Sequence, residues 1–186
     1  MRNSKNNDLE TGRILVAEPF LQDPNFRRGV VLLCDHQDDG SFGFILNKPI
    51  DMGINDLIAN FPDFKSDVYY GGPVQTDTIH YLHTKGDILP NSIEVLNGVY
   101  WGGDFEVLKD FIRNDRIKSD DIRFYVGYSG WSAGQLKSEK DYHSWMTVDG
   151  HIDYVFSENK KLWKEILEKE GGTYGIIAHM QAPNLN

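Results

Sequence analysis

The sequence predicts an α+β fold built mainly on an antiparallel sheet. Short runs rich in β-branched and aromatic residues, typical of strands, recur along the chain between turn residues. Other stretches carry apolar residues at helical spacing. Strands and helices neither alternate regularly nor gather at opposite ends, so a doubly wound parallel sheet is not expected. With 186 residues, 40% of them hydrophobic, the chain has the material for one sizeable core.

The strand pattern begins with a predicted β-hairpin. Residues 29–34 (GVVLLC) and 42–46 (FGFIL) flank the turn residues Asp38-Asp39-Gly40, and residues 14–17 form an earlier short strand. The remaining strands are expected over residues 68–70, 78–83, 93–101, 121–128 and 145–148.

Four helices are expected to flank the sheet. The clearest runs from Asp104, a favourable N-cap, through the apolar stripe that ends at Ile112. A second covers residues 159–170 and stops at Gly171-Gly172. Shorter helices are predicted over residues 54–61, ended by Pro62, and 133–142.

Composition limits the domain organisation and the partners. Residues 1–10 are too polar to be ordered alone and predict a disordered tail, and residues 11–186 predict a single domain. A formal charge of -9 disfavours direct binding to nucleic acid, whose affinity depends on Lys and Arg. Cys34 is the only cysteine and no apolar run has membrane-spanning length, so we expect a cytoplasmic protein without a membrane contact.

Residues 130–134 (GWSAG) match the G-x-S-x-G pattern of a nucleophile elbow, which would make Ser132 a catalytic serine. The stretch after Gly134 is short for the strand and helix units that carry the acid and histidine of such a triad. We therefore expect a glycine-rich strand-to-helix turn that starts near Gly127, with Ser132 as a helix cap.

Metal and anion sites are weaker hypotheses. Cys34 and His36 share a face of a predicted strand and, with His80 or His83, could supply zinc ligands, but no established ligand spacing is present. We therefore expect Cys34 to be a core residue, and neither a metal nor a cofactor. The pairs Gly71-Gly72 and Gly102-Gly103 are expected to form tight turns rather than phosphate cradles, because no P-loop or dinucleotide pattern is present.

Aromatic residues near the glycine-rich turns could line a cleft for a flat ligand or a peptide, or could belong to the core. These residues are Tyr69, Tyr70, Tyr100, Trp101, Tyr128 and Trp131. The acidic pairs Asp38-Asp39 and Asp120-Asp121 are expected to face solvent.

An ordered set of motifs, spread over residues 12–186, resembles the YqgE/AlgH family of bacterial proteins. The resemblance implies a compact α+β domain with a barrel-like antiparallel sheet flanked by helices. It implies no enzyme activity, since the family is of unknown molecular function and some members are described as transcriptional regulators. The usual Gly-Trp-Gly of the family reads Gly-Trp-Ser here, which weakens the nucleophile hypothesis. The motifs are Asp23-Pro24-Asn25-Phe26, Val30-Val31 leading to His36, Gly43 leading to Asn47-Lys48-Pro49, Gly71-Gly72-Pro73-Val74, His83, Gly127-Tyr128-Ser129-Gly130-Trp131, Gly134-Gln135-Leu136 and Trp145.

We therefore expect a non-enzymatic binding or regulatory domain that takes a small molecule or a protein partner in a cleft. Polar side chains and glycine-freed backbone beside aromatic rings could converge there, although some of these residues could instead satisfy backbone groups at turns. The alternative is an enzyme of unassigned class, a serine hydrolase if Ser132 is a nucleophile. The residues expected at the cleft are His36, Asn47, Gly72, Pro73, Trp131 and Gln135.

Overall fold

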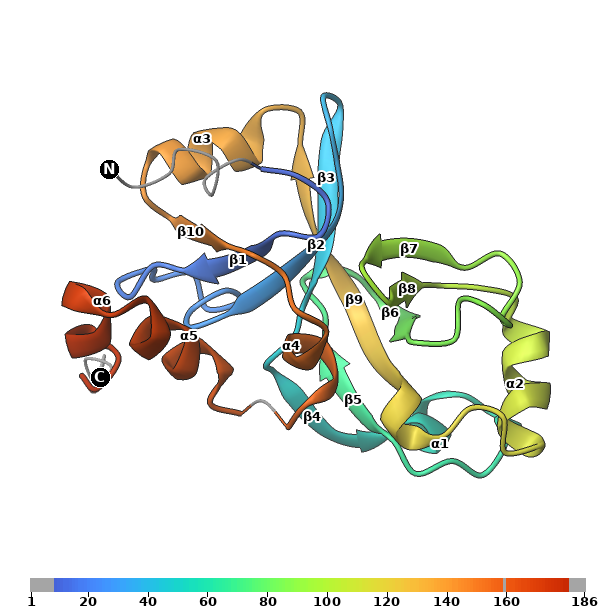
Figure 1. Cartoon of the computed structure of the whole chain (residues 1–186). Coiled ribbons are helices and arrows are strands. Elements are labelled where there is room, and N and C mark those ends of the chain that lie inside the picture. The colour runs from blue at the N-terminus through green and yellow to red at the C-terminus, as the bar shows by residue number, and fades with distance from the viewer. Residues whose placement is uncertain (1–8, 159, 181–186) are drawn as a thin grey trace.

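The structure, a computed structural model, describes residues 9–158 and 160–180 and arranges ten strands in one open, branched sheet (Figure 1). In chain order the strands are β1 (Ile14–Ala17), β2 (Val30–Gln37), β3 (Gly40–Ile45), β4 (Pro49–Gly53), β5 (Asp67–Tyr70), β6 (Val74–His83), β7 (Ile93–Leu96), β8 (Val99–Trp101), β9 (Ile122–Ser132) and β10 (Trp145–Val148).

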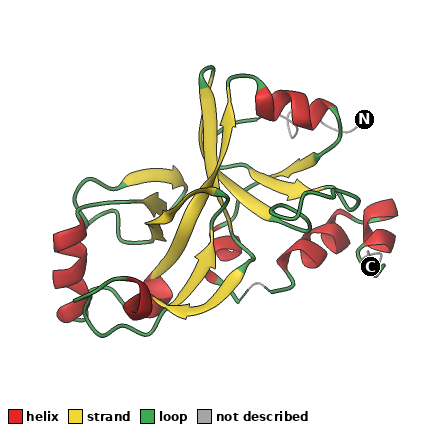
Figure 2. Cartoon of the chain, turned by 180° about the vertical axis from the view of Figure 1, so that it is seen from behind, coloured by secondary structure: helices red, strands yellow, loops and turns green. Residues whose placement is uncertain are grey.

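β9 is the strand that joins the two wings of the sheet. Its C-terminal part pairs with β3, which continues through β2 and β1 to β10. Its N-terminal part lies between β5 and β6, and β6 continues through β8 to β7. Every pairing is antiparallel except that of β5 with β9, which is parallel. Figures 1 and 2 show β9 running between the wings.

The α+β class and the largely antiparallel sheet are confirmed, but the sheet does not close into a barrel. β10 and β7 stand at opposite ends of the strand order, and they do not pair within the described part of the chain. β9 has 11 residues and is long enough for its C-terminal part to pair with β3 while its N-terminal part pairs with β5 and β6. The sheet therefore branches at β9 instead of curling onto its own edge.

The helical elements among the described residues are six α-helices and a 3-10 turn at Ser119–Asp121. No helix among residues 9–158 and 160–180 is long and apolar enough to cross a membrane. The helices are α1 (Ile54–Leu57), α2 (Phe105–Arg113), α3 (Gln135–Asp141), α4 (Ile152–Phe156), α5 (Leu162–Glu170) and α6 (Gly172–Ile177).

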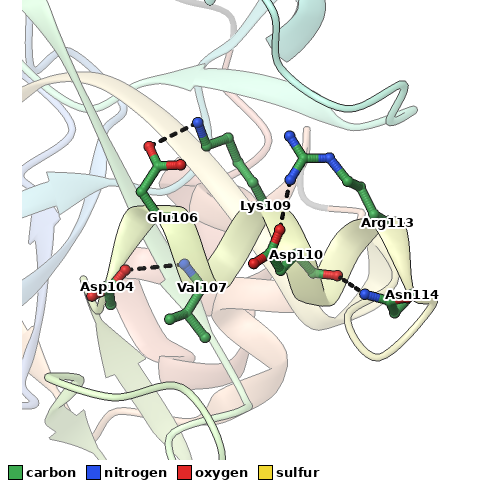
Figure 3. A network of polar contacts seen from close by, with 7 residues as sticks. All are labelled: Asp104, Glu106, Val107, Lys109, Asp110, Arg113 and Asn114. Atoms are coloured by element: carbon green, nitrogen blue, oxygen red, sulfur yellow. Dashed lines mark hydrogen bonds and ion pairs between the residues drawn. The ribbon is translucent and has the colours of Figure 1, made fainter.

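α2 begins as its sequence predicts. The Asp104 carboxylate accepts a hydrogen bond from the backbone N–H of Val107 at 3.0 Å, which caps the helix (Figure 3). At the other end Arg113 bonds Asp110 at 2.7 Å on the solvent side. Leu108 and Ile112 are buried in an apolar cluster with Val68 of β5, Tyr81 of β6 and Phe124 of β9, so the predicted amphipathic stripe is confirmed.

α1 is shorter than predicted because a side chain organises the loop that follows it. Asn55 donates to the carbonyls of Phe61 and Pro62 at 3.2 and 2.9 Å and accepts from the N–H of Phe64 at 3.0 Å. These side-chain bonds replace a further helical turn, so α1 ends at Leu57.

Three elements have no counterpart in the sequence prediction: β4, α4 and α6. α5 ends at Gly171 as expected, with a φ of 70°, but α6 starts directly afterwards although its sequence (GTYGII) lacks an apolar stripe. A tertiary contact holds it, since the Tyr174 hydroxyl donates to Glu18 at 2.9 Å. Of the predicted tail, residues 1–8 lie outside the described residues, while Leu9 packs on the apolar core and Glu10 pairs with Arg13.

The core divides between the faces of the sheet. Along β2, Val30, Leu32 and Cys34 pack into one apolar cluster, and Val31 and Leu33 pack into another on the opposite face. Because side chains alternate in this way, neighbouring residues of β3 and β9 also lie on opposite faces of the sheet and have different surroundings.

Candidate functional site

Residues 130–134 (GWSAG) form the end of β9 and the turn into α3. β9 continues to Ser132, which pairs with Gly40 of β3, so Gly127 lies inside the strand and not in a turn. The turn itself is made by Ala133 and Gly134, and the φ of 73° at Gly134 is a conformation that glycine adopts without strain. The prediction that the turn starts near Gly127 is therefore wrong.

Ser132 is exposed and bonded to Gln135. Its hydroxyl donates to Gln135 Oε1 at 3.2 Å, and the same oxygen accepts from the Ser132 N–H at 3.0 Å. Gly134 is the N-cap of α3, so the predicted capping role of Ser132 is wrong. No histidine within the described ranges is hydrogen-bonded to Ser132, so the arrangement supplies no general base for a serine nucleophile.

Glu139 explains why Trp131 and Gln135 belong to one motif. Its carboxylate accepts from the indole N–H groups of Trp131 and Trp145 at 3.0 and 2.9 Å, and from the Gln135 amide at 2.9 Å. The two indoles contact edge to face at 6.1 Å, and Phe26 stacks on Trp131. This network holds α3 onto the β10–β1–β2–β3 wing.

Gly71 and Gly72 are required by a close backbone crossing. A Cβ at Gly71 would lie 2.4 Å from the Gly127 carbonyl oxygen, and one at Gly72 would lie 2.3 Å from the Tyr128 carbonyl carbon. The Ser129 hydroxyl donates to the Gly71 carbonyl at 2.9 Å across this contact. The glycine pair therefore does not form the isolated tight turn that was expected, because it lies directly on β9 and leaves room only for hydrogen.

Asn47 bonds two backbone groups of one loop. Its Oδ1 accepts from the Val30 N–H at 2.9 Å, and its Nδ2 donates to the Arg28 carbonyl at 2.8 Å. Arg28 has a φ of 55°, so this amide supports an unfavourable backbone conformation. The neighbouring Lys48 ammonium donates to the Asn25 carbonyl of the same loop. These contacts correspond to the backbone-satisfying role considered for Asn47.

A pocket of about 490 Å³ opens where β3, β6, β8 and β9 meet, with the β2–β3 turn at its rim. Trp131 lines it, and His36 reaches it through a 2.6 Å hydrogen bond with Ser41. The other expected cleft residues, Asn47, Gly72, Pro73 and Gln135, are not among the lining residues. The lining residues are Asp35, Asp39, Gly40, Ser41, Phe42, His80, Trp101, Tyr128, Gly130 and Trp131.

Four rings on this face contact one another in a closed series. Phe42 lies 4.9 Å from Trp101 and 6.2 Å from Tyr128, measured between ring centroids. His80 lies 5.8 Å from Tyr128 and 6.4 Å from Trp101. Trp101 and Tyr128 were among the aromatic candidates in the sequence, whereas Phe42 was not singled out and His80 was considered only as a zinc ligand. We call these four rings the aromatic box.

A β-bulge places Asp35 on the same face as the aromatic box. The register of β2 against β3 shifts between Leu33 and Asp35, so Asp35 stands opposite Phe42. Without the extra residue Cys34 would occupy this register position and Asp35 would lie on the face of Leu33. The bulge thus brings Asp35 to the pocket, and Asp39 of the adjacent turn, which is exposed as expected, also lines it.

His80 lines the pocket, and its hydrogen bond with Thr78 defines which ring nitrogen carries the proton in the neutral form. The Thr78 hydroxyl donates to the Gln75 carbonyl at 2.7 Å, so it accepts from His80 Nε2 at 3.0 Å. Burial lowers the pKa of His80, because the imidazolium form is poorly solvated there. In the resulting tautomer Nδ1 carries a lone pair, and no described residue donates a hydrogen bond to it.

The residues considered as zinc ligands are separated by the fold. Cys34 is buried in an apolar cluster, and burial raises the pKa of its thiol. His83 is buried as well; its Nε2 donates to the Gly102 carbonyl at 2.7 Å and its Nδ1 accepts from the Lys85 N–H at 3.1 Å. Across residues 9–158 and 160–180, no three His, Cys, Asp or Glu side chains are grouped closely enough to hold a metal ion.

These features define an α+β domain with an open, branched antiparallel sheet and an aromatic-lined pocket at the branch point. The AlgH-like family model matches residues 14–175, so the chain belongs to the AlgH-like family, which is of unknown molecular function. A UPF0301 protein of Chlorobaculum tepidum is 42% identical over 180 residues that cover 96% of each chain. One of Cytophaga hutchinsonii is 39% identical, over 96% of this chain and 100% of that protein.

Two solved structures have the same fold. The crystal structure of a Corynebacterium diphtheriae protein gives a TM-score of 0.77 at 20% identity and covers 94% of each chain. The solution structure of the AlgH protein from Pseudomonas aeruginosa gives a TM-score of 0.70 at 25% identity, over 92% of this chain and 94% of that one. The family predicted from the ordered motifs is confirmed.

Proposed function

We propose that the protein is a non-enzymatic binding domain that takes a small molecule in the pocket at the branch point of the sheet. The observation that carries the proposal is the pocket itself, with a volume of about 490 Å³ and a lining of aromatic rings and a few polar groups. Small-molecule sites combine these two properties.

The family motifs support this role indirectly. Asn47 and the Gly71-Gly72 pair each fix a segment next to β3 or β9, and the motif residues Trp131 and Gln135 are both bonded to Glu139. A binding pocket needs such rigid walls, because walls that are ordered before the ligand arrives lose less conformational entropy on binding. In this proposal the family motifs keep the segments around β3 and β9 in place, and the ligand contacts the aromatic box.

We further propose that any regulatory role runs through a protein partner that responds to the ligand. The formal charge of -9 opposes a phosphate backbone, so direct contact with DNA is disfavoured. A mobility-shift assay at low salt tests this point, and a stable complex with duplex DNA would contradict it.

The binding proposal is tested by screening a fragment library against ¹⁵N-labelled protein and following backbone amide shifts. We expect fragments that shift the amides of β3, β8 and β9 around the pocket, and a Trp101→Ala variant that binds them about tenfold more weakly. Tyr142→Ala is the matched control, because this aromatic side chain is 82% exposed and lies outside the pocket lining. A screen without hits at the pocket would overturn the proposal.

The hydrolase alternative is tested separately with a fluorophosphonate probe. We expect no labelling, because Ser132 has no general base within hydrogen-bond distance in the described structure. Labelling that disappears in Ser132→Ala would show a reactive serine and would overturn the non-enzymatic proposal.

A further inference from the structure

The polar groups of the pocket are arranged to receive a hydrogen-bond donor or a positive charge. Asp35 and Asp39 contribute carboxylates, and His80 contributes a neutral ring with an unprotonated Nδ1. None of the lining residues is Lys or Arg. Within the described residues neither aspartate forms an ion pair, and the one hydrogen bond to their carboxylates comes from the Gln37 amide to Asp35 at 2.9 Å. The pocket is therefore negatively charged and its charge is not neutralised internally.

The aromatic box adds the second property that cations favour. The faces of Phe, Tyr and Trp rings carry negative electrostatic potential and attract a cation within about 6 Å of the ring centroid. Phe42, Trp101 and Tyr128 come from three different strands and contact one another in this box. These rings pack edge to face against one another and all line the pocket, so a cation bound there contacts aromatic residues of more than one strand.

Asp35 and Asp39 line the same pocket as these rings because of the chain's local geometry. The bulge at Cys34 turns Asp35 to the face of Phe42, and the two-residue turn before Gly40 carries Asp39 to the rim. A metal ion does not suit this lining, since the described residues hold no group of three His, Cys, Asp or Glu side chains that could bind one, and beside the two aspartates the lining consists of aromatic residues, Ser41 and two glycines. An alkylated ammonium, with a diffuse charge and apolar methyl groups, suits both the rings and the carboxylates.

We infer that the pocket binds a small organic cation with an alkylated ammonium group, held over the aromatic box and paired with Asp35 and Asp39. This inference rests on the proposed function and specifies its ligand class. It extends beyond the family assignment, which carries no ligand.

The test compares choline with 3,3-dimethylbutan-1-ol, which has the same shape but carries carbon in place of the charged nitrogen. Binding is followed by amide shifts of the full chain, with benzyltrimethylammonium as a larger cation and benzoate as an anion. We expect both cations to shift the pocket amides and to bind at least about tenfold more tightly than the alcohol or benzoate.

Two substitutions with a matched control show whether the predicted groups are responsible. Asp39→Asn removes one charge at the rim, and Trp101→Leu removes an aromatic face while it keeps an apolar side chain. Each is expected to weaken binding of the cations several-fold and to leave binding of the alcohol unchanged. Asp38→Asn is the control, because Asp38 belongs to the same turn and has the same charge but does not line the pocket.

The outcomes separate this inference from the proposed function. If the alcohol or benzoate binds the pocket as tightly as choline, or if Asp38→Asn and Asp39→Asn weaken choline binding equally, the cation inference is wrong while the binding function stands. If neither these probes nor any fragment of the library shifts the pocket amides, both are wrong.

Discussion

Replacing Glu139 with Ala is expected to destabilise the fold, because one carboxylate satisfies two indole N–H groups. Trp131 and Trp145 are 5% and 3% exposed, so water has little access to replace the lost acceptor. A hydrogen bond to a charged acceptor contributes about 1.5–3 kcal/mol, and the lower end applies here because Glu139 is only half-buried. The expected loss is about 3 kcal/mol in the free energy of unfolding, measured by urea denaturation.

The same loss corresponds to a fall in Tm of about 6 to 12 °C for a chain of this length. Glu139→Gln retains one carbonyl acceptor and is expected to lose about half as much stability. Lys137→Ala, at an exposed position of the same helix, is the control and is expected to change the free energy of unfolding by less than about 0.5 kcal/mol. A loss no larger than that of the control in Glu139→Ala would refute the network as a stabilising contact.

Three further predictions concern the backbone crossing, the buried thiol and the histidines. Gly72→Ala is expected to lower the free energy of unfolding, measured by urea titration, by more than about 3 kcal/mol, because its Cβ would lie 2.3 Å from the Tyr128 backbone. Gly134→Ala, whose Cβ would have nothing within 4 Å, is expected to lower it by only about 1 kcal/mol through backbone strain. Equal losses in the two variants would contradict the close backbone crossing. Cys34 is expected to resist a thiol reagent in the native protein and to react after denaturation, because burial raises its pKa; rapid native labelling would count against this. Burial lowers the pKa of His80 and His83, so as the pH falls through about 6.5 the folded state takes up fewer protons than the unfolded state. The free energy of unfolding is therefore expected to be full above that pH and to fall on acidification, less steeply in His80→Asn. An unchanged slope in that variant would argue against the lowered pKa of His80.

Part of the candidate site could be predicted from the sequence and part could not. The aromatic residues Trp101 and Tyr128 were expected near a cleft because they adjoin glycine-rich turns. Phe42 was missed, since in the sequence it is only one apolar position within a predicted strand, and His80 was considered only as a zinc ligand and not as part of the cleft. Asp35 could not be placed at all, because the bulge that turns it to the pocket depends on the pairing of β2 with β3 and has no local signal.

The predicted start of the strand-to-helix turn near Gly127 was wrong for a related reason. A glycine-rich segment that follows a strand indicates a turn when only local preferences are considered. In the structure Gly127 is glycine because the Gly72 backbone lies against it, a contact between segments far apart in the chain. The sequence shows that glycine is present but does not show which neighbour requires it.

The sequence by itself determined the α+β class, the family, the positions of most strands and the capped helix α2, because these depend on local periodicity, capping and ordered motifs. Only the tertiary structure decided that the sheet stays open, that β9 joins two wings, and that carboxylates and rings from separate strands meet in one pocket. The physical reason is that strand pairing and bulges are contacts between distant residues, and the side-chain period of 2 makes the face of every residue depend on that register.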